Sequence, residues 1–366
     1  MKFRVTVPVS FLILIFALAG FRNQEPKRFL KGNLHTHSYW SDGNTFPQEV
    51  ARWYRDHGYQ FLAVTDHNIL QEGRKTKVIA RDTVVLKTLA AYRGEFEKKG
   101  EFLILNSEEI SDASEKRPVH LNGFNLTQIV KPAGGITTGE STEANVKAIR
   151  KALENSETPE WIMVNHPNFG WGLSTDDLAR SGARFFEVFN GHPSVRNYGD
   201  SAHPSTEVMW DRANKWRIDN GLPLLLGTAT DDAHQYDQYG VGKANPGRGW
   251  VMVRAAELTP LALYQAMYTG DFYSSTGVEL ADFSSTSKRL NIRIKEEPGV
   301  RYKTEFIGWR KGKDQPEILK TMDGTKASYK RTGNELFVRA RITSGKTKAN
   351  PFAEGDVEMA WTQPVK

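Results

Sequence analysis

Short apolar runs alternate with segments of helical apolar spacing over the first two thirds of the chain. The runs have the length of buried strands and lie at 32–38, 60–67, 101–110, 118–125, 161–167, 184–191 and 222–234. Helical candidates lie between several of them, at 47–58, 84–100 and 142–156. Alternating strands and helices predict a parallel sheet, and this many repeats favours closure into a barrel. We therefore expect an α/β barrel over residues 28–282.

The pattern changes at about residue 283. Apolar residues then alternate singly with polar ones, as in Leu290, Ile292 and Ile294, and glycine-containing turns separate the alternating stretches. Single alternation is typical of strands that bury one face. We expect a small, sandwich-like antiparallel β-domain over residues 284–366.

The N-terminus has the pattern of a secretory signal peptide over residues 1–19. Lys2 and Arg4 precede an apolar run that ends in Ala17-Leu18-Ala19, a suitable signal peptidase site. The run is shorter than a membrane span usually requires. We expect a secreted or periplasmic protein with no membrane span after cleavage; an uncleaved membrane anchor is the alternative.

Composition narrows the chemistry further. The 366 residues include no cysteine, which excludes disulfides and thiolate metal sites, so any metal would be held by His, Asp and Glu. The formal net charge is +6, with no long Lys/Arg block. This balance fits a small anionic substrate and argues against a stable nucleic-acid partner. The oligomeric state stays open.

The first candidate for chemistry is the stretch from His35 to Gly43, which reads HTHSYWSDG. On an extended strand, residues i and i+2 face the same side, so His35 and His37 aim two imidazoles at one point. That is the geometry of a bidentate metal grip. Asp42 follows on a turn, from which its carboxylate reaches the same place. The chain has nine histidines, and this motif uses two.

Later apolar runs also end in residues that can bind metals. These residues are His67, Glu108, Glu109, His120, His166, Asp231, Asp232 and His234. In a parallel barrel the carboxyl ends of the strands share one face, where active sites are built. We therefore expect these side chains to converge on one metal centre.

Taken in order, HTHSYWSDG, TDHN, SEEIS, HLNGFN, NHP and DDAH resemble the successive motifs of the polymerase and histidinol phosphatase (PHP) family. The resemblance covers roughly residues 30–282. It implies a distorted (β/α)7 TIM-like barrel that binds two to three divalent ions and hydrolyses phosphate esters. Local matching within the motifs favours Glu109 over Glu108 and Asp232 over Asp231.

The resemblance also implies three sets of metal ligands. The sets are His35, His37, Glu109 and Asp232 for the first ion, Glu109 with His120 and His166 for the second, and Asp42, His67 and His234 for the third. A mixed imidazole and carboxylate shell suits Zn²⁺, Mn²⁺ or Fe²⁺. Bridged ions of this kind generate a hydroxide that attacks phosphorus in line, so Asp232 and Glu109 are also catalytic candidates.

We therefore expect a secreted metal-dependent phosphoesterase acting on a small organic phosphate mono- or diester. Two alternatives are a nuclease or nucleotide phosphodiesterase acting on nucleic-acid ends, and a non-catalytic surface binding module with structural metals. Structural metal sites are usually closed by four ligands. The shared ligand Glu109 argues for open coordination positions and hence for catalysis.

Candidates for substrate contact lie beside the expected rim. His192, Arg184 and Arg196 are the principal ones, and Lys243 and Arg248 are further cations near the rim. A solvated surface role is the alternative for each cation. Tyr39 and Trp40, inside the first motif, are candidates for stacking on the substrate or for packing the barrel mouth. We expect structural roles for His57, at a helix end, and for His203, in a loop.

Overall fold

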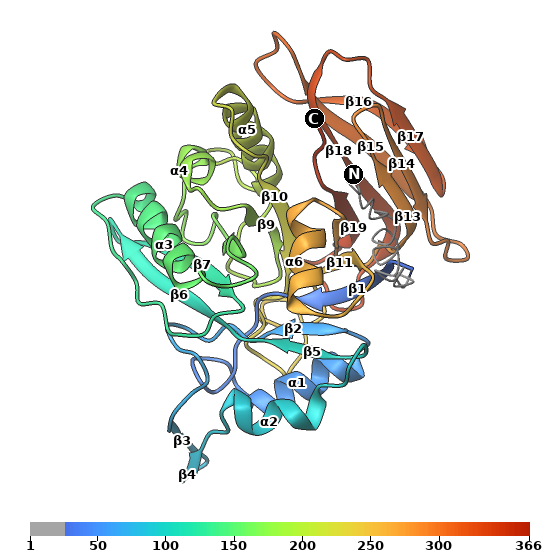
Figure 1. Cartoon of the computed structure of the whole chain (residues 1–366). Coiled ribbons are helices and arrows are strands. Elements are labelled where there is room, and N and C mark those ends of the chain that lie inside the picture. The colour runs from blue at the N-terminus through green and yellow to red at the C-terminus, as the bar shows by residue number, and fades with distance from the viewer. Residues whose placement is uncertain (1–25) are drawn as a thin grey trace, which may run out of the picture.

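The computed structural model describes residues 26–366, so the predicted signal peptide lies outside the described residues. These residues form six helices and nineteen strands (Figure 1). The helices are α1 (Pro47–Asp56), α2 (Leu89–Phe96), α3 (Thr138–Ala152), α4 (Thr175–Arg180), α5 (Thr206–Asp219) and α6 (Pro260–Tyr268). The strands are β1 (Arg28–Asn33), β2 (Phe61–Ala63), β3 (Thr76–Ile79), β4 (Asp82–Val85), β5 (Leu103–Leu105), β6 (Ser107–Ser114), β7 (Arg117–Phe124), β8 (Ile162–Val164), β9 (Phe185–Asn190), β10 (Leu226–Thr230), β11 (Trp250–Ala255), β12 (Phe272–Ser275), β13 (Leu280–Ser285), β14 (Arg289–Ile294), β15 (Tyr302–Arg310), β16 (Glu317–Asp323), β17 (Lys326–Lys330), β18 (Glu335–Thr347) and β19 (Val357–Thr362).

Two sheets carry the region that precedes residue 283. One has the order β10-β9-β8-β7-β6, and the other begins β5-β2-β1-β11-β12 and continues into the C-terminal strands. Isolated parallel bridges join the two sheets at Thr36 with Ala233 and at His67 with Glu109. The fold is therefore a mixed α/β fold, as predicted, and closure into a barrel stays a prediction.

Not all strands of this region are parallel. β1, β2 and β5 run parallel, as do β8, β9 and β10, whereas β7 is antiparallel to both β6 and β8. The expectation of a fully parallel sheet was wrong here because β6 and β7 form a hairpin. Glu115 and Lys116 close it in a two-residue turn, with φ of 52° and 62°.

Helix boundaries follow local capping. Thr137 accepts from the Glu140 amide while the Glu140 carboxylate accepts from the Thr137 amide, a capping box that starts α3. Pro47 starts α1, where its missing N–H is not needed. The predicted helix at 84–100 is shorter than expected, because Val84 and Val85 belong to β4.

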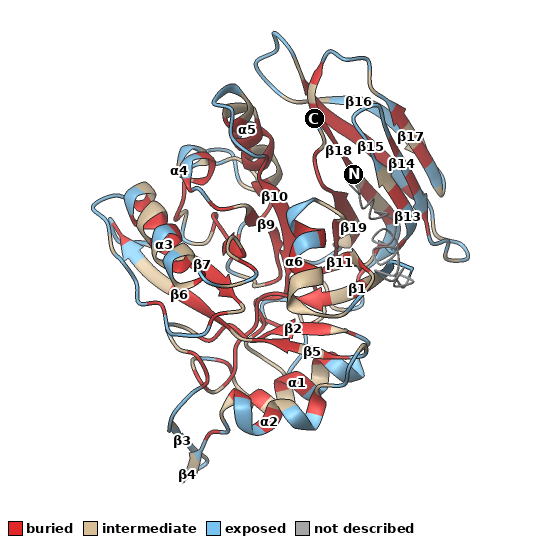
Figure 2. Cartoon of the chain, in the orientation of Figure 1, coloured by how far each residue is buried: buried red, intermediate tan, exposed pale blue. Residues whose placement is uncertain are grey.

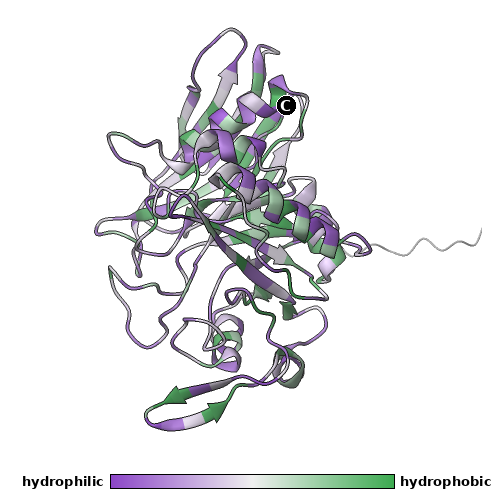
Figure 3. Ribbon diagram, turned by 90° about the vertical axis from the view of Figure 1, so that its left-hand side faces the viewer, coloured by the Kyte–Doolittle hydropathy of each residue, from purple (hydrophilic) through white to green (hydrophobic). Residues whose placement is uncertain are grey.

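Buried residues concentrate in the strands and on the inward faces of the helices (Figure 2). α3, α4 and α5 cover the five-stranded sheet through a core that includes Val146, Ile149, Leu178 and Met209. The β3–β4 hairpin stands apart from this packing and projects from the body of the protein (Figure 3). Between residues 26 and 366, no helix combines the length and apolarity needed to cross a membrane.

The C-terminal strands are antiparallel, and most of them extend the second sheet. β19 pairs with β12, through Tyr273 with Thr362, and β18, β15 and β16 follow in order. β13, β14 and β17 form a separate three-stranded sheet packed on the same core. The strands before and after residue 283 are thus hydrogen-bonded together, and the proposed domain boundary stays a prediction.

A buried ion network fixes α5 to these C-terminal strands. Arg339, on β18, donates from Nε and Nη2 to the two carboxylate oxygens of Asp211 at 2.8 and 2.7 Å. It also donates from Nη1 to Glu207 at 2.9 Å. Only 1% of the Arg339 side chain is exposed. The bidentate geometry satisfies a charge that burial would otherwise make costly.

We expect Arg339→Ala to destabilise the fold by about 3–5 kcal/mol, because it removes the arginine partner of the buried Asp211 and leaves Glu207 with Arg341 alone. Urea unfolding measures the loss. Arg289→Ala, at an exposed position on β14, is the control and should change stability by less than about 0.5 kcal/mol. Equal losses in the two variants would contradict the importance of the network.

Candidate metal centre

The first motif continues from β1 and places both of its histidines inside the protein. His35 and His37 are fully buried, with ring centroids 5.2 Å apart. The His37 amide donates to Ala233 O at 2.9 Å, and the Asp232 amide donates to His35 O at 2.9 Å. Backbone hydrogen bonds thus join the first motif, which starts at His35, to the last motif, which ends at His234.

The carboxylate of Glu109 lies at the centre of the cluster. Oε2 lies 3.3 Å from His35 Nε2 and 3.0 Å from His67 Nδ1. Oε1 lies 3.1 Å from His120 Nδ1 and 3.3 Å from His166 Nε2. Oε2 also lies 3.4 Å from His37 Nε2. Since the two oxygens face different sets of imidazoles, Glu109 has the position of a bridging ligand.

Asp232 closes the cluster from the opposite side. Its Oδ1 lies 3.0 Å from His37 Nε2 and 3.3 Å from His35 Nε2. Asp232 adopts a left-handed backbone conformation with φ of 49°. Such strain in a residue other than glycine is held where surrounding structure demands it, often at functional sites.

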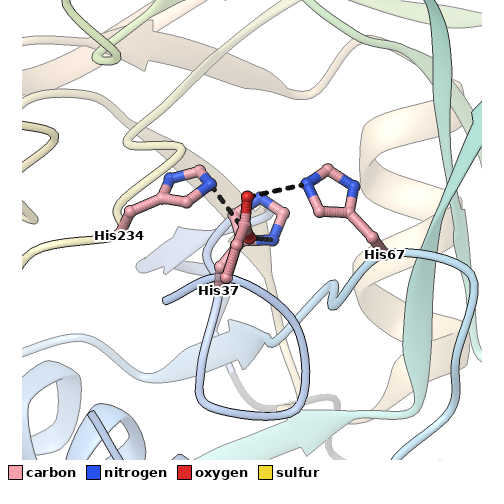
Figure 4. Close-up of side chains that lie close together, drawn as sticks. His37, His67 and His234 are labelled. Atoms are coloured by element: carbon pink, nitrogen blue, oxygen red, sulfur yellow. Dashed lines mark ion pairs between the residues drawn. The ribbon is translucent and has the colours of Figure 1, made fainter. Parts of the chain in front are cut away.

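A third group lies at the open edge. Asp42 Oδ2 lies 3.4 Å from His67 Nε2, and Asp42 Oδ1 lies 3.3 Å from His234 Nε2. Figure 4 shows His67 and His234 on opposite sides of this carboxylate, with His37 close by. The Asp42 side chain is 57% exposed, so this edge of the cluster is open to solvent.

The donor set fits divalent cations. The His35 Nδ1 faces Glu187 Oε1 at 2.7 Å, so Nδ1 carries the proton and a neutral His35 turns the Nε2 lone pair toward Glu109. Within residues 26–366, His35 Nε2 and Glu109 Oε2 are both buried without a hydrogen-bond partner. Two ligands of a tetrahedral ion lie about 3.3–3.6 Å apart, close to the separation of these atoms. A cation between them would satisfy both.

Four groups of three or four side chains could each hold a metal ion, because all donor atoms of a group lie within 4.8 Å of one another. The groups are His37, Asp42, His67 and His234; His35, His37 and Asp232; His35, Glu109 and His166; and His67, Glu109 and His120. All nine ligands expected from the resemblance therefore converge. Their grouping by ion stays a prediction.

Comparison with known proteins gives one curated relative at high identity. The DNA polymerase/3'-5' exonuclease PolX of Bacillus subtilis, a polymerase with a PHP domain, is 36% identical over 232 residues. The match covers 60% of this chain and 38% of the length of PolX. No family model matches the chain. Over the matched part, the chain is similar to a protein that contains a PHP domain.

Two solved structures give matches of low score. A two-domain protein from Bacteroides vulgatus with a predicted PHP-like metal-dependent phosphoesterase is 16% identical, with a TM-score of 0.48 over 95% of this chain and 100% of that one. A protein from Bifidobacterium adolescentis, assigned as a metal-dependent phosphoesterase, is 15% identical, with a TM-score of 0.33 over 58% of this chain and 89% of that one.

Some histidines of the cluster hold protons in the metal-free protein, whereas burial lowers the pKa of His37 and of His120. Burial opposes charging of His67, but Glu109 and Asp42 raise its pKa to about 11. Burial likewise opposes charging of His35, whose pKa Asp232 and Glu109 raise well above its usual range. Despite burial, the neighbouring histidines hold the pKa of Glu109 well below its ordinary value. Bound cations would displace these protons.

The two paired carboxylates of the motifs face different ways. Glu108 accepts from the Val130 amide at 3.3 Å, and burial raises its pKa to about 8. Asp231 accepts from the Tyr54 hydroxyl at 2.8 Å and from the Gly249 amide at 2.8 Å. Glu109 and Asp232 therefore face the cluster, as the resemblance implied, while Glu108 and Asp231 brace the surrounding backbone.

Glu187, on β9, is a functional residue that the sequence reasoning missed. Its Oε1 accepts from His35 Nδ1 and from Thr230 Oγ1 at 2.6 Å, and its Oε2 accepts from the His166 amide at 2.7 Å. Glu187 thus orients two ligand-bearing segments at once. A carboxylate inside the apolar run FFEVF was the available signal.

His192 and Arg196 lie on the loop that follows β9, beside the cluster. The His192 ring centroid lies 5.3 Å from that of His234, and its Nδ1 accepts from the Ser194 amide at 3.2 Å. Its Nε2 therefore carries the proton when the ring is neutral. Arg196 is exposed, with its guanidinium 5.9 Å from the Trp171 ring. Their contact with substrate stays a prediction.

Arg184 lies at the wrong end of the strand for substrate contact. It precedes β9, and its guanidinium donates to the carbonyl oxygens of Leu224 and Tyr268 at the amino ends of the strands. The cluster lies at the carboxyl ends. The expectation that Arg184 contacts the substrate is corrected by this position.

The other aromatic and histidine candidates pack against neighbouring side chains or backbone. Trp40 is fully buried and donates from Nε1 to Lys87 O at 2.8 Å, so of its two expected roles packing is favoured over stacking on the substrate. Tyr39 is half-buried against Phe46. His57 stacks on Trp53 at a helix end, and His203 stacks on Trp171 in a loop, in agreement with the structural roles expected for them.

Metal binding should stabilise the protein more as the pH rises. The folded pKa of His67, about 11, exceeds the usual 6.5, so its protonated form stabilises the metal-free protein fully below pH 6.5 and less as the pH rises above it. A cation replaces that proton. We expect the difference in Tm between metal-loaded and metal-free protein to widen from pH 6.5 to pH 9 in calorimetry. A constant or narrowing difference would contradict this interpretation.

Glu187→Gln should weaken metal affinity by about 10–100-fold, because the amide no longer accepts from both His35 and the His166 backbone. Titration calorimetry with Zn²⁺ or Mn²⁺ measures this. Glu108→Gln is a matched control, since Glu108 is also a carboxyl in the ligand segment but faces away and is mostly neutral near pH 7. Equal weakening in both variants would show a general packing effect.

Proposed function

We propose that this protein is a PHP-type metal-dependent phosphoesterase that hydrolyses a small organic phosphate mono- or diester. The observation that carries the proposal is the shared position of Glu109, whose two oxygens lie within 3.4 Å of five different histidines. Ligands shared in this way leave each ion short of protein donors. Open coordination positions are typical of catalytic rather than structural metal sites.

Two to three divalent ions, Zn²⁺, Mn²⁺ or Fe²⁺, fit the four ligand groups. The ligand assignment implied by the PHP resemblance is His35, His37, Glu109 and Asp232; Glu109, His120 and His166; and Asp42, His67 and His234. When bound, such ions activate water and neutralise the charge of a phosphoryl group.

The protein groups around the cluster have separate tasks. Glu187 holds His35 in one tautomer, and Asn165 donates from Nδ2 to Glu109 Oε1 at 2.9 Å, fixing that carboxylate. His192 offers an N–H donor at the open side, where it would bind a phosphoryl oxygen or the leaving group. Arg196 is an exposed cation on the same loop.

The proposed scaffold is a distorted seven-stranded ring. Its strands would be β1, β2, β5 continued by β6, β7, β8, β9 and β10. The parallel bridges of Thr36 with Ala233 and of His67 with Glu109 support this closure. The ring would place the ligand segments at one face, formed by the carboxyl ends of its parallel strands and, for His120, by the amino half of the antiparallel β7.

A nuclease or nucleotide phosphodiesterase is the second candidate. The 36% identity to an enzyme named as a 3'-5' exonuclease favours it. The net charge of +6, without a long basic block, favours short substrates instead. Export to the periplasm or outside the cell remains our proposal from the first nineteen residues.

Asp232→Asn and His166→Ala should each lose metal. They should also lower hydrolysis of p-nitrophenyl phosphate and bis(p-nitrophenyl) phosphate by more than about 100-fold, because loss of a metal ligand should cost more than the 10–100-fold typical of a residue that only supports a ligand. Metal analysis and a mono- and diester panel measure both effects. His203→Ala is the control, because His203 lies outside the cluster.

Turnover of neither ester by metal-loaded protein would oppose the proposed phosphoesterase. Hydrolysis confined to oligonucleotide ends, with a steep salt dependence, would favour the nuclease instead.

A further inference from the structure

The buried guanidinium of Arg248 joins three segments at the rim. Arg248 is fully buried and donates from Nη1 to Gly191 O at 3.0 Å and to Lys243 O. From Nη2 it donates to Gly240 O at 2.8 Å and to Asn350 Oδ1 at 3.2 Å. Across residues 26–366, no carboxylate lies within ion-pair distance of this guanidinium, so oxygens of neutral groups satisfy its donors. Each of these hydrogen bonds therefore matters for a charge held away from water.

Gly191 connects Arg248 to the candidate site. It immediately precedes His192, and its amide donates to Thr230 O at 2.9 Å. A Cβ at Gly191 would lie 2.8 Å from Asp231 O and 2.9 Å from the Arg248 side chain. The backbone of Arg248 is itself tied to the ligand segment, since its amide donates to Asp231 Oδ1 at 2.6 Å. Arg248 therefore fixes the start of the His192 loop relative to Asp232.

The loop between β18 and β19, residues 348–356, reaches this point from the C-terminal strands. Asn350 accepts from Arg248 through Oδ1 and donates from Nδ2 to Pro246 O at 3.0 Å. Phe352 packs on Phe189, at the end of β9, with ring centroids 5.8 Å apart. Tyr198, on the His192 loop, donates to Asp356 at 3.3 Å. The β18–β19 loop thus contacts both sides of the segment that carries His192.

We propose that Asn350 is a positioning residue for substrate binding, and that the β18–β19 loop completes the rim of the metal centre. Asn350 holds Arg248, Arg248 holds Gly191, and this chain sets where the His192 N–H donor lies. The inference rests on the proposed function for the role of His192. It gives the C-terminal strands a task in the reaction, beyond stability.

A double-mutant cycle tests the path through His192. Asn350→Ala should raise KM for p-nitrophenyl phosphate by about tenfold, with a smaller change in kcat, because small displacements of positioning groups have effects of this size. In a His192→Ala background the same substitution should change KM by less than about twofold. Asn350→Asp keeps the acceptor for Arg248 and should recover most of the loss. Asn334→Ala, in an exposed turn of the C-terminal strands, is the matched control.

Hydrogen exchange provides a readout independent of activity. Amides of residues 191–198 should exchange faster in Asn350→Ala, while β6 and β7 and the bound metal content stay unchanged. Unchanged exchange at 191–198, or the same KM effect with and without His192, would overturn the proposal. If the wild-type protein hydrolyses no ester, the phosphoesterase proposal fails, and faster exchange at 191–198 would still support the positioning contact.

Discussion

The buried carboxylate of Glu109 is the constraint on which the centre depends. A full negative charge in a dry interior is costly unless opposite charge lies beside it. In the metal-free protein, protons on His35, His67 and His166 supply that charge, because the pKa of each of these histidines is raised. These side chains come from the segments after β1, β2 and β8 and converge on Glu109 of β6. The strands of both sheets are thereby held in one arrangement by a shared electrostatic requirement.

The scaffold meets this requirement through strand ends. A strand presents alternate residues to opposite faces, so Glu109 enters the cluster while Glu108 packs behind it. The same division separates Asp232 from Asp231, aided by the left-handed backbone of Asp232. Glu187 then fixes the imidazole of His35 from the strand beneath. In each pair, one carboxylate therefore faces the metal ligands while its neighbour in the sequence points the other way and hydrogen-bonds to the surrounding backbone.

The sequence was sufficient for the mixed α/β class and for the convergence of nine side chains, because metal-competent residues followed apolar runs in a recognisable order. It was insufficient where a role depends on distant partners. Glu187 meets His35 152 residues away, and the buried Trp40 donates a hydrogen bond to the carbonyl oxygen of Lys87. Arg184 was misplaced because the pattern does not tell the amino end of a short strand from its carboxyl end. The β6–β7 hairpin was missed because its turn, Glu115-Lys116, lacks the Asn-Gly or Asp-Gly pair typical of tight turns.

The pairing of β12 with β19 has a consequence for how the molecule is completed. One edge of β12 pairs with β11, and its other edge pairs with β19, which lies near the end of the chain. Until those residues are in place, Tyr273, Ser274 and Ser275 present unpaired backbone groups of the kind that recruit other strands. The last strand therefore acts as a cap against aggregation during folding. A chain shortened by β19 would keep every metal ligand but would expose the backbone hydrogen-bonding groups along one edge of β12.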